Sequence, residues 1–296
     1  MIKRISLALL IVSMLFASGF VKMNFLKLIT IWGSTTIRGL VKDMARKFTS
    51  KTGISIDVKG GGSGRGVYGI YKNLIHIGNS SRDIRGREIF IFRREKIKIK
   101  RIKIGILPIL IIVNKKNNWI KSLDVNKIRD IYLGRITNWK QLGGPDERII
   151  FYTLDRSSGV GHAFLKIYLG KKYWRKRIYA INTGNNNDMC IKVSENRYAI
   201  GYTNYLHYNK YKNIIKTVSI SNKEKGIDFP VMPTLKNIKS NKYHAINYMY
   251  QFVREKVYRK NLSVKKFIHF MLNNPKITRR AGFIPVDPKT AISDVW

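Results

Sequence analysis

The sequence predicts an α/β fold in which mostly parallel strands alternate with helices. Three observations support this prediction: apolar runs of strand length recur, apolar residues at helical spacing follow them, and Gly, Ser and Thr gather where the two meet. At 296 residues, 44% of them hydrophobic, the chain can form one large domain or two of ordinary size. Units of strand, turn and helix build parallel sheets, and the loops at the carboxyl ends of the strands contact ligands.

The first two units follow one another near the start of the chain. The run LKLITIWGS predicts a strand, and the next segment predicts a helix closed by Gly53. The apolar positions of that helix are Ile37, Leu40, Val41, Met44, Ala45 and Phe48. The run ISIDVKG then alternates like a strand, and VYGIYKNL indicates a second helix. Between these two, residues 60–66 include five glycines, which marks a tight turn or a close approach of a ligand to the main chain.

Four loops share one composition and together predict an anion site. Each joins a strand to a helix and is rich in Gly, Ser or Thr: residues 33–36, 60–66, 79–82 and 156–159. The beginning of a helix offers unpaired N–H groups and the positive end of the helix dipole. Arginine adds a charged fork that suits phosphate or carboxylate. An ordinary helix cap is the alternative for any single loop, and the spacing matches no nucleotide-binding motif.

The net charge of +40 comes from 57 basic and 17 acidic residues. Such an excess invites a nucleic-acid interpretation, because lysine and arginine displace counterions from phosphate backbones. The basic residues, however, run through nearly every segment, with local runs only at 92–103 and 171–177. We therefore expect that the excess of Lys and Arg reflects a drift in amino-acid composition, accommodated on solvent-exposed surfaces. We expect no specific nucleic-acid partner, but a general attraction of the protein for anions.

The first residues have the order of a secretory signal peptide. Lys3 and Arg4 precede an apolar run over residues 5–16, and the small residues 17–19 follow it. We expect cleavage after Gly19 and a mature protein in the periplasm; an uncleaved anchor is the alternative. The single cysteine, Cys190, is far from this segment, which predicts no lipid attachment there and no intrachain disulfide.

The motifs of the chain resemble one family in order. GSTT, GGGSGRGV, IGNSSRDI, IIVNKKN, DIYLGRITNWKQLGG, SSGVGHAF, YAIGYTNYLHY and AGFIPV are similar to segments of the phosphate-binding proteins of ABC-type phosphate uptake systems. The resemblance implies a two-lobed periplasmic-binding-protein fold, type II-like, in which each lobe is a mostly parallel sheet flanked by helices. Two crossing strands are expected near ILPILIIVN and INYMYQFV. Residues 20–107 plus 246–296 would form the first lobe and residues 108–245 the second.

The resemblance also implies which residues bind phosphate. The family's contacts fall on the hydroxyl of Thr35, the N–H of Thr36, Ser63, Ser81, Ser158, Gly159 and Val160. Arg82 is expected to reach the ligand or to brace its loop, with a surface ion pair as the alternative. The bare backbone around Ser63 would let a tetrahedral anion lie against the main chain at a helix start.

Two departures from the family pattern leave the ligand's identity open. Leu154 stands where the family has an arginine, and Val160 stands where it has a threonine. Arg156 either replaces the missing guanidinium through a rebuilt loop or faces solvent. Some members also carry an aspartate at the place of Ser81 that accepts the proton of monohydrogen phosphate; Asp83 or Asp155 are the candidates to replace it.

We expect a binding protein and no enzyme, cofactor or metal. The five histidines have no metal-ligand spacing with one another or with Cys190, and SSGVG is not the Gly-x-Ser-x-Gly of serine hydrolases. The resemblance implies a monomer that captures inorganic phosphate and delivers it to permease subunits driven by a cytoplasmic ATPase. The alternative keeps the scaffold but changes its oxyanion selectivity, or uses the basic surface for nucleic acid or anionic lipid.

Overall fold

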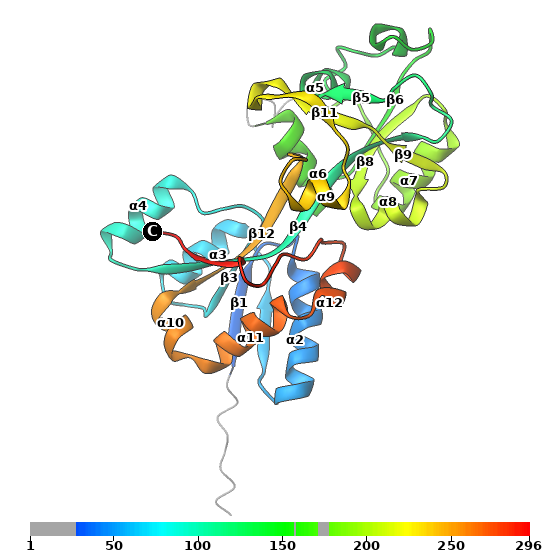
Figure 1. Ribbon diagram of the computed structural model, residues 1–296. Helices are drawn as coiled ribbons and strands as arrows, with labels where there is room; N and C mark the ends of the chain where they lie inside the picture. Colours follow the sequence, from blue (N-terminus) through cyan, green and yellow to red (C-terminus); the bar gives the residue numbers. More distant parts are fainter. Residues whose placement is uncertain (1–27, 157, 171–177) are drawn as a thin grey trace, which may run out of the picture.

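The computed structural model describes residues 28–156, 158–170 and 178–296, and these form two lobes. Figure 1 shows the lobes joined by two long strands, β4 (Ile99–Asn114) and β12 (Ile246–Arg254), which run from one lobe into the other. The two-lobed α/β fold that the sequence and the resemblance predicted is therefore confirmed. Among the described residues, no helix is both long and apolar enough to cross a membrane.

The first lobe combines segments from both ends of the described chain. Its strands are β1 (Ile29–Gly33), β2 (Ile56–Lys59), β3 (Ile77–Ser80) and β13 (Ile292–Asp294). Its helices are α2 (Arg38–Thr52), α3 (Gly62–Tyr71), α4 (Gly86–Arg94), α10 (Glu255–Lys260), α11 (Leu262–Leu272) and α12 (Pro275–Arg280). Strand β1 pairs in parallel with both β2 and β3. Because the carboxyl ends of parallel strands meet at one edge, the loops that follow them are neighbours.

Helices cover both faces of this sheet. Ile29 and Ile31 of β1 pack into the large hydrophobic core with α2, whereas Trp32 packs against a second cluster that includes Val67 and Ile70 of α3. Alternate residues of a strand point to opposite faces, so one short strand supports a helix on each side. The predicted helical positions of α2 are buried as the spacing indicated, and Gly53 ends the helix with a left-handed φ of 68°.

The second lobe is built from the middle of the chain. Its strands are β5 (Ser122–Asp124), β6 (Ile150–Thr153), β7 (Ile181–Asn182), β8 (Ala199–Asn204), β9 (Ile215–Thr217), β10 (Ser219–Asn222) and β11 (Ile227–Val231). Its helices are α5 (Val125–Tyr132), α6 (Gly159–Phe164), α7 (Asn186–Glu195), α8 (Tyr205–Tyr211) and α9 (Leu235–Lys239). Shorter helical turns are η1 (Trp139–Leu142), η4 (Lys223–Lys225) and the π-helical η2 (Leu165–Leu169), which continues α6. Strand β6 is parallel to β7 and β8.

The crossing strands connect the two parallel groups into one mixed sheet. Strand β4 pairs antiparallel with β12 as far as Pro108, and from Ile109 onward it pairs antiparallel with β8. The carbonyl of Ile109 accepts hydrogen bonds from the hydroxyls of Tyr168 (3.1 Å) and Tyr243 (2.8 Å), both fully buried. The lobe boundary at 107/108 stays a proposal, which this exchange of partners supports.

Two sequence expectations are refined and two lie outside the described residues. The helix expected at VYGIYKNL begins earlier, at Gly62, inside the glycine cluster. The crossing strand expected at ILPILIIVN is the second half of a 16-residue strand. The signal peptide at 1–19 and the basic run at 171–177 lie outside the residues that the structure describes.

Candidate functional site

The first and third predicted loops lie in contact at the carboxyl ends of β1 and β3. The N–H of Ser34 donates to the carbonyl of Asn79 at 2.9 Å. A β carbon on Gly33, whose φ is 140°, would lie 2.0 Å from that same carbonyl oxygen. Only glycine allows this approach, so the local sequence fixes how closely the two loops meet.

The glycine cluster packs against the same place. Gly61 and Gly62 have φ angles of 121° and 84°, which turn the chain into α3. A β carbon on Gly66 would lie 2.7 Å from the carbonyl oxygen of Asn79 and 2.9 Å from that of Trp32. Glycine is thus needed in this cluster for two reasons: the left-handed turn at the start of α3, and the close packing of α3 over the ends of β1 and β3.

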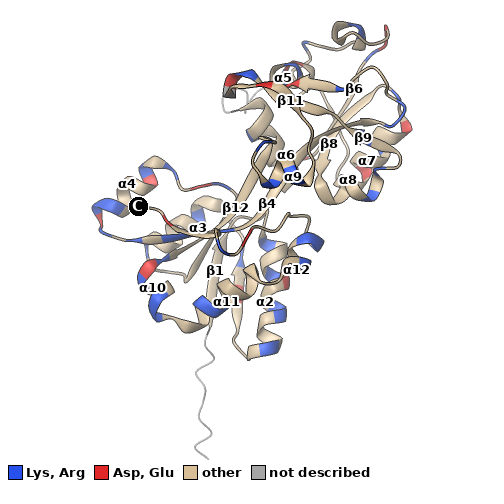
Figure 2. Ribbon diagram, viewed as in Figure 1, with Lys and Arg blue, Asp and Glu red and all other residues tan. Residues whose placement is uncertain are grey.

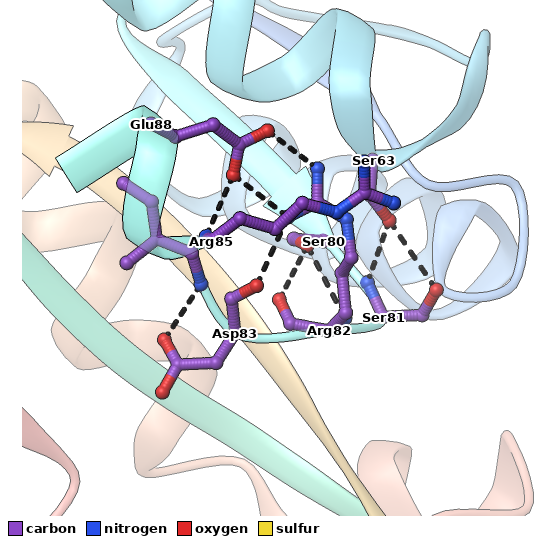
Figure 3. Close-up of polar contacts among 8 residues, drawn as sticks. Ser63, Ser80, Ser81, Arg82, Asp83, Arg85 and Glu88 are labelled. Atoms are coloured by element: carbon purple, nitrogen blue, oxygen red, sulfur yellow. Dashed lines mark hydrogen bonds and ion pairs between the residues drawn. The ribbon is translucent and has the colours of Figure 1, made fainter. Parts of the chain in front are cut away.

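Ser63 and Ser81, two of the predicted phosphate contacts, are hydrogen-bonded to each other (Figure 3). The N–H of Ser81 donates to Oγ of Ser63 at 3.1 Å, and the two hydroxyl oxygens are 3.3 Å apart. Ser63 is the second residue of α3, and Ser81 directly follows β3. A helix start and a strand end therefore present two hydroxyls side by side.

Arg82 braces the third loop. Its guanidinium makes two hydrogen bonds to the carboxylate of Glu88 on α4, at 2.8 and 2.7 Å, and donates to the carbonyl of Asp83 at 3.0 Å (Figure 3). The side chains of Arg82 and Glu88 are only 16% and 17% exposed, so this pair is largely shielded from water. Of the roles expected for Arg82, the structure shows the bracing one.

The Glu88 carboxylate holds the loop as an anion. Burial raises the pKa of Glu88, but hydrogen bonds from the Arg82 guanidinium and the N–H of Arg85, together with their charges, outweigh it and leave the pKa below 4.5. The carboxylate of Asp83 also has partners within the protein: it accepts a hydrogen bond from the N–H of Ile84 and pairs with Arg101. Asp83 is therefore poorly placed to replace the proton-accepting aspartate of the family.

The fourth loop brings the second lobe to the first. Ser158 caps α6: its hydroxyl accepts the N–H of Gly161 at 3.0 Å and donates to the carbonyl of Asp155 at 2.8 Å. The next residue, Gly159, lies against Thr36, since its β carbon would be 2.6 Å from Cγ2 of that threonine. Thr35 in turn is close to the glycine cluster, with its Cγ2 3.2 Å from a β carbon built on Gly60. All four predicted loops thus meet at one place.

The two residues of the fourth loop that differ from the family pattern point into the hydrophobic core. Leu154 is 2% exposed and Val160 is 5% exposed, and both belong to the large core cluster. The N–H of Leu154 donates to the hydroxyl of Tyr202 at 2.9 Å. Neither side chain can contact an anion, so any contribution of Val160 comes from its main chain. Arg156 and Asp155 are exposed at the start of the same loop.

Sequence reasoning missed two polar residues beside the site. Asn247 of β12 is 5% exposed and donates from Nδ2 to the carbonyl of Ser81 at 2.9 Å. Its Oδ1 accepts a hydrogen bond from Nζ of Lys166, on η2 of the second lobe, also at 2.9 Å. The two amides within the mostly apolar strand INYMYQFV, Asn247 and Gln251, were a usable signal, whereas Lys166 was hidden among the many lysines. Nothing among the described residues groups three or more His, Cys, Asp or Glu as a metal site.

Comparison with known proteins identifies the family. The model of the PBP superfamily domain matches residues 25–275. The chain belongs to the PBP superfamily. Among curated proteins, this PBP chain is 28% identical over 262 residues to the phosphate-binding protein PstS of Staphylococcus aureus (strain USA300), which spans 87% of this chain and 78% of the relative.

Two solved structures share the fold of this PBP chain. A possible phosphate binding protein from Planctomyces limnophilus superposes with a TM-score of 0.78 at 23% identity, covering 89% of this chain and 94% of the other. An ABC-type phosphate transport receptor from Vibrio cholerae gives a TM-score of 0.70 at 25% identity, covering 86% of this chain and 99% of the other. Both likenesses extend over the two lobes, so the lobes and their crossing strands are shared as one unit.

Proposed function

We propose that this chain is the substrate-binding component of an ABC phosphate importer and captures inorganic phosphate between its two lobes. The observation that carries the proposal is the meeting of four loops rich in N–H and hydroxyl groups, at the point where Thr36 of the first lobe touches Gly159 of the second. Relatives named as PstS and as an ABC-type phosphate transport receptor support the same ligand. The proposal contains no catalytic step.

The proposed contacts come from both lobes. The first lobe contributes Thr35, Thr36, Ser63 and Ser81, and the second contributes Ser158, the main chain of Gly159 and Val160, and Arg156. Oxyanions are held well by N–H groups at helix starts and by hydroxyl donors, because hydrogen bonds to a charged group are the strong ones. Since Ser63 and Ser81 are hydrogen-bonded to each other, a bound phosphate would compete for these hydroxyls.

The proposed partners are a membrane permease and its cytoplasmic ATPase, with the chain acting as a monomer in the periplasm after cleavage behind Gly19. Intact mass measurement of the exported protein tests the cleavage, because retention of Met1 would contradict it. The relatives do not favour the alternative of a polyanion-binding surface. Lys and Arg are spread over helices and loops of both lobes in Figure 2, without gathering on one of them.

Calorimetric titration of the mature protein with phosphate and, separately, with sulfate tests the proposal. We expect phosphate binding that Ser63→Ala weakens about tenfold or more, since a hydrogen bond to a charged group contributes about 1.5–3 kcal/mol. Ser158→Ala should weaken binding as well and also lower stability, by about 0.5–2 kcal/mol, because it removes the cap of α6.

Ser50→Ala is the matched control for both variants. Its hydroxyl is exposed on α2 and donates only to the carbonyl of Lys47, within the same helix. We expect its phosphate affinity to equal that of the parent. A parent protein that binds no phosphate would contradict the proposed function. Serine variants that all bind phosphate like the parent would contradict the proposed site.

A further inference from the structure

A single buried side chain connects the two lobes next to the proposed site. Asn247, on the crossing strand β12, donates to the carbonyl of Ser81 in the first lobe and accepts from Nζ of Lys166 in the second, each at 2.9 Å. The amide is 5% exposed and both of its polar ends are used. The orientation of the amide is internally consistent, because nitrogen donates to a carbonyl and oxygen accepts from an ammonium group.

The segment that carries Lys166 is firmly held. It lies on the π-helical turn η2, which continues directly from α6, whose start is the Ser158 and Gly159 loop. Two residues after Lys166, the buried hydroxyl of Tyr168 donates to the carbonyl of Ile109, at the point where β4 changes its strand partner. The turn is thus anchored to the crossing strand, which limits where the base of the lysine side chain can move.

The place of the family's fourth-loop arginine holds no charge in this chain, and Arg156, two positions later, is exposed. Leu154 replaces the arginine and is buried in the core, and the guanidinium of Arg82 is already paired with Glu88. An ammonium group is a compact charge with three donors, and Asn247, which accepts one hydrogen bond from Lys166, is neutral. Because the same Asn247 donates to the Ser81 carbonyl, one side chain separates the Lys166 ammonium from the Ser81 loop.

We propose that Lys166 supplies a positive charge to the phosphate site in addition to Arg156, and that Asn247 is the positioning residue that holds it beside Ser81. The inference rests on the proposed function and assigns a further charge of that same site to the second lobe. A cation held on the crossing strand favours an anion where the four loops meet and links its binding to the approach of the two lobes.

Calorimetric titration with inorganic phosphate at two salt concentrations tests the inference. We expect Lys166→Met to weaken phosphate binding about tenfold and to reduce its dependence on salt, because salt screens attraction between separated charges. Lys166→Arg, which keeps the charge, should stay within about twofold of the parent. Asn247→Leu should weaken binding, and the Lys166→Met/Asn247→Leu double variant should lose less than the sum, since both act through one contact.

Lys140→Met is the matched control. Lys140 also lies on the second lobe, is exposed and pairs with Asp146, and its removal lowers the net charge by the same amount. Its phosphate affinity should stay within about twofold of the parent.

The outcomes separate the inference from the function on which it rests. The inference fails if the parent binds phosphate and a folded Lys166→Met variant binds it equally well, or binds it more weakly with an unchanged salt dependence. Either result would overturn the charge role of Lys166 and leave the proposed function standing. A parent that binds no phosphate would overturn both. Thermal unfolding of each variant shows whether it is folded, and Lys166→Gln replaces Lys166→Met if the latter is not.

Discussion

Gly159 and Thr36 form the contact at which the two lobes meet inside the proposed site. A β carbon on Gly159 would lie 2.6 Å from Cγ2, 3.3 Å from Cβ and 3.4 Å from Oγ1 of Thr36. Threonine is branched at Cβ and stiff, so it cannot easily turn away from such a contact. The glycine at the start of α6 therefore sets how closely the fourth loop approaches the first.

Gly159→Ala should weaken phosphate binding about tenfold, because the added methyl group would push the two loops apart. Calorimetry measures the affinity, and small-angle X-ray scattering measures whether the variant is more extended when phosphate is added. Gly39→Ala serves as the control: a β carbon there meets nothing within 4 Å, and the residue lies near the start of α2. Equal affinity of Gly159→Ala and Gly39→Ala would show that the contact does not matter for binding.

Two glycines of the cluster, both inside α3, should respond oppositely to alanine. Gly66→Ala would place its methyl group against the carbonyl oxygens of Asn79 and Trp32, and we expect a loss of about 1–3 kcal/mol in the free energy of unfolding. A β carbon on Gly64 meets nothing within 4 Å, so Gly64→Ala should raise stability by about 0.5–1 kcal/mol. Urea unfolding of the two variants decides the matter, and similar values for both would contradict it.

Local sequence patterns were sufficient to predict the alternation of strands and helices. The helical spacing and Gly53 predicted α2, and the alternation of ISIDVKG preceded β2. The pattern did not predict that α3 begins inside the glycine cluster, because glycine has poor helix propensity and tertiary packing decides the matter. Nor did it predict the full length of β4, whose first half alternates basic and apolar residues like a solvated strand.

The proposed site could be predicted from the sequence only where one loop carries its own signal. Thr35, Ser63, Ser81 and Ser158 stand in short glycine-rich motifs that mark helix starts and strand ends. The contact of Lys166 with Asn247 joins residues 81 positions apart, and no periodicity of the chain brings them together. The burial of Leu154 was equally hidden, because a loop leucine beside exposed residues can point either to the core or to a bound ligand.

Glu88→Gln should lower the free energy of unfolding by about 1–3 kcal/mol at neutral pH, since it removes the anion that Arg82 and Arg85 bind. The pKa of Glu88 in the folded protein lies below its ordinary value of 4.5. The stabilisation is therefore present above pH 4.5 and is lost as the pH falls through the lowered value. Urea unfolding at several pH values should show the parent and the variant converging in acid.

Glu95→Gln is the control for that experiment. Glu95 pairs with Arg94 on the surface, where the two side chains are 41% and 63% exposed. Such a pair contributes about 0–1 kcal/mol, so its loss should have little effect at any pH. A Glu88→Gln variant as stable as Glu95→Gln would mean that the Arg82 brace does not hold the third loop.

Leu154→Arg restores the residue that the family has at this position. We expect it to destabilise the protein and not to increase its affinity for phosphate. Leu154 is 2% exposed within the core, and its N–H is fixed by the hydroxyl of Tyr202. Burial raises the pKa of that tyrosine to about 12, so the phenol stays neutral and offers no counter-charge to a guanidinium. An unpaired charge at this position should cost about 3–5 kcal/mol, whereas Leu154→Met, which keeps the volume, should cost less than about 1.5 kcal/mol. Thermal unfolding and calorimetry on both variants test this prediction. A stable Leu154→Arg variant that binds phosphate more tightly would contradict it. Such a result would mean that the loop turns outward and that the charge assigned to Lys166 can also come from position 154.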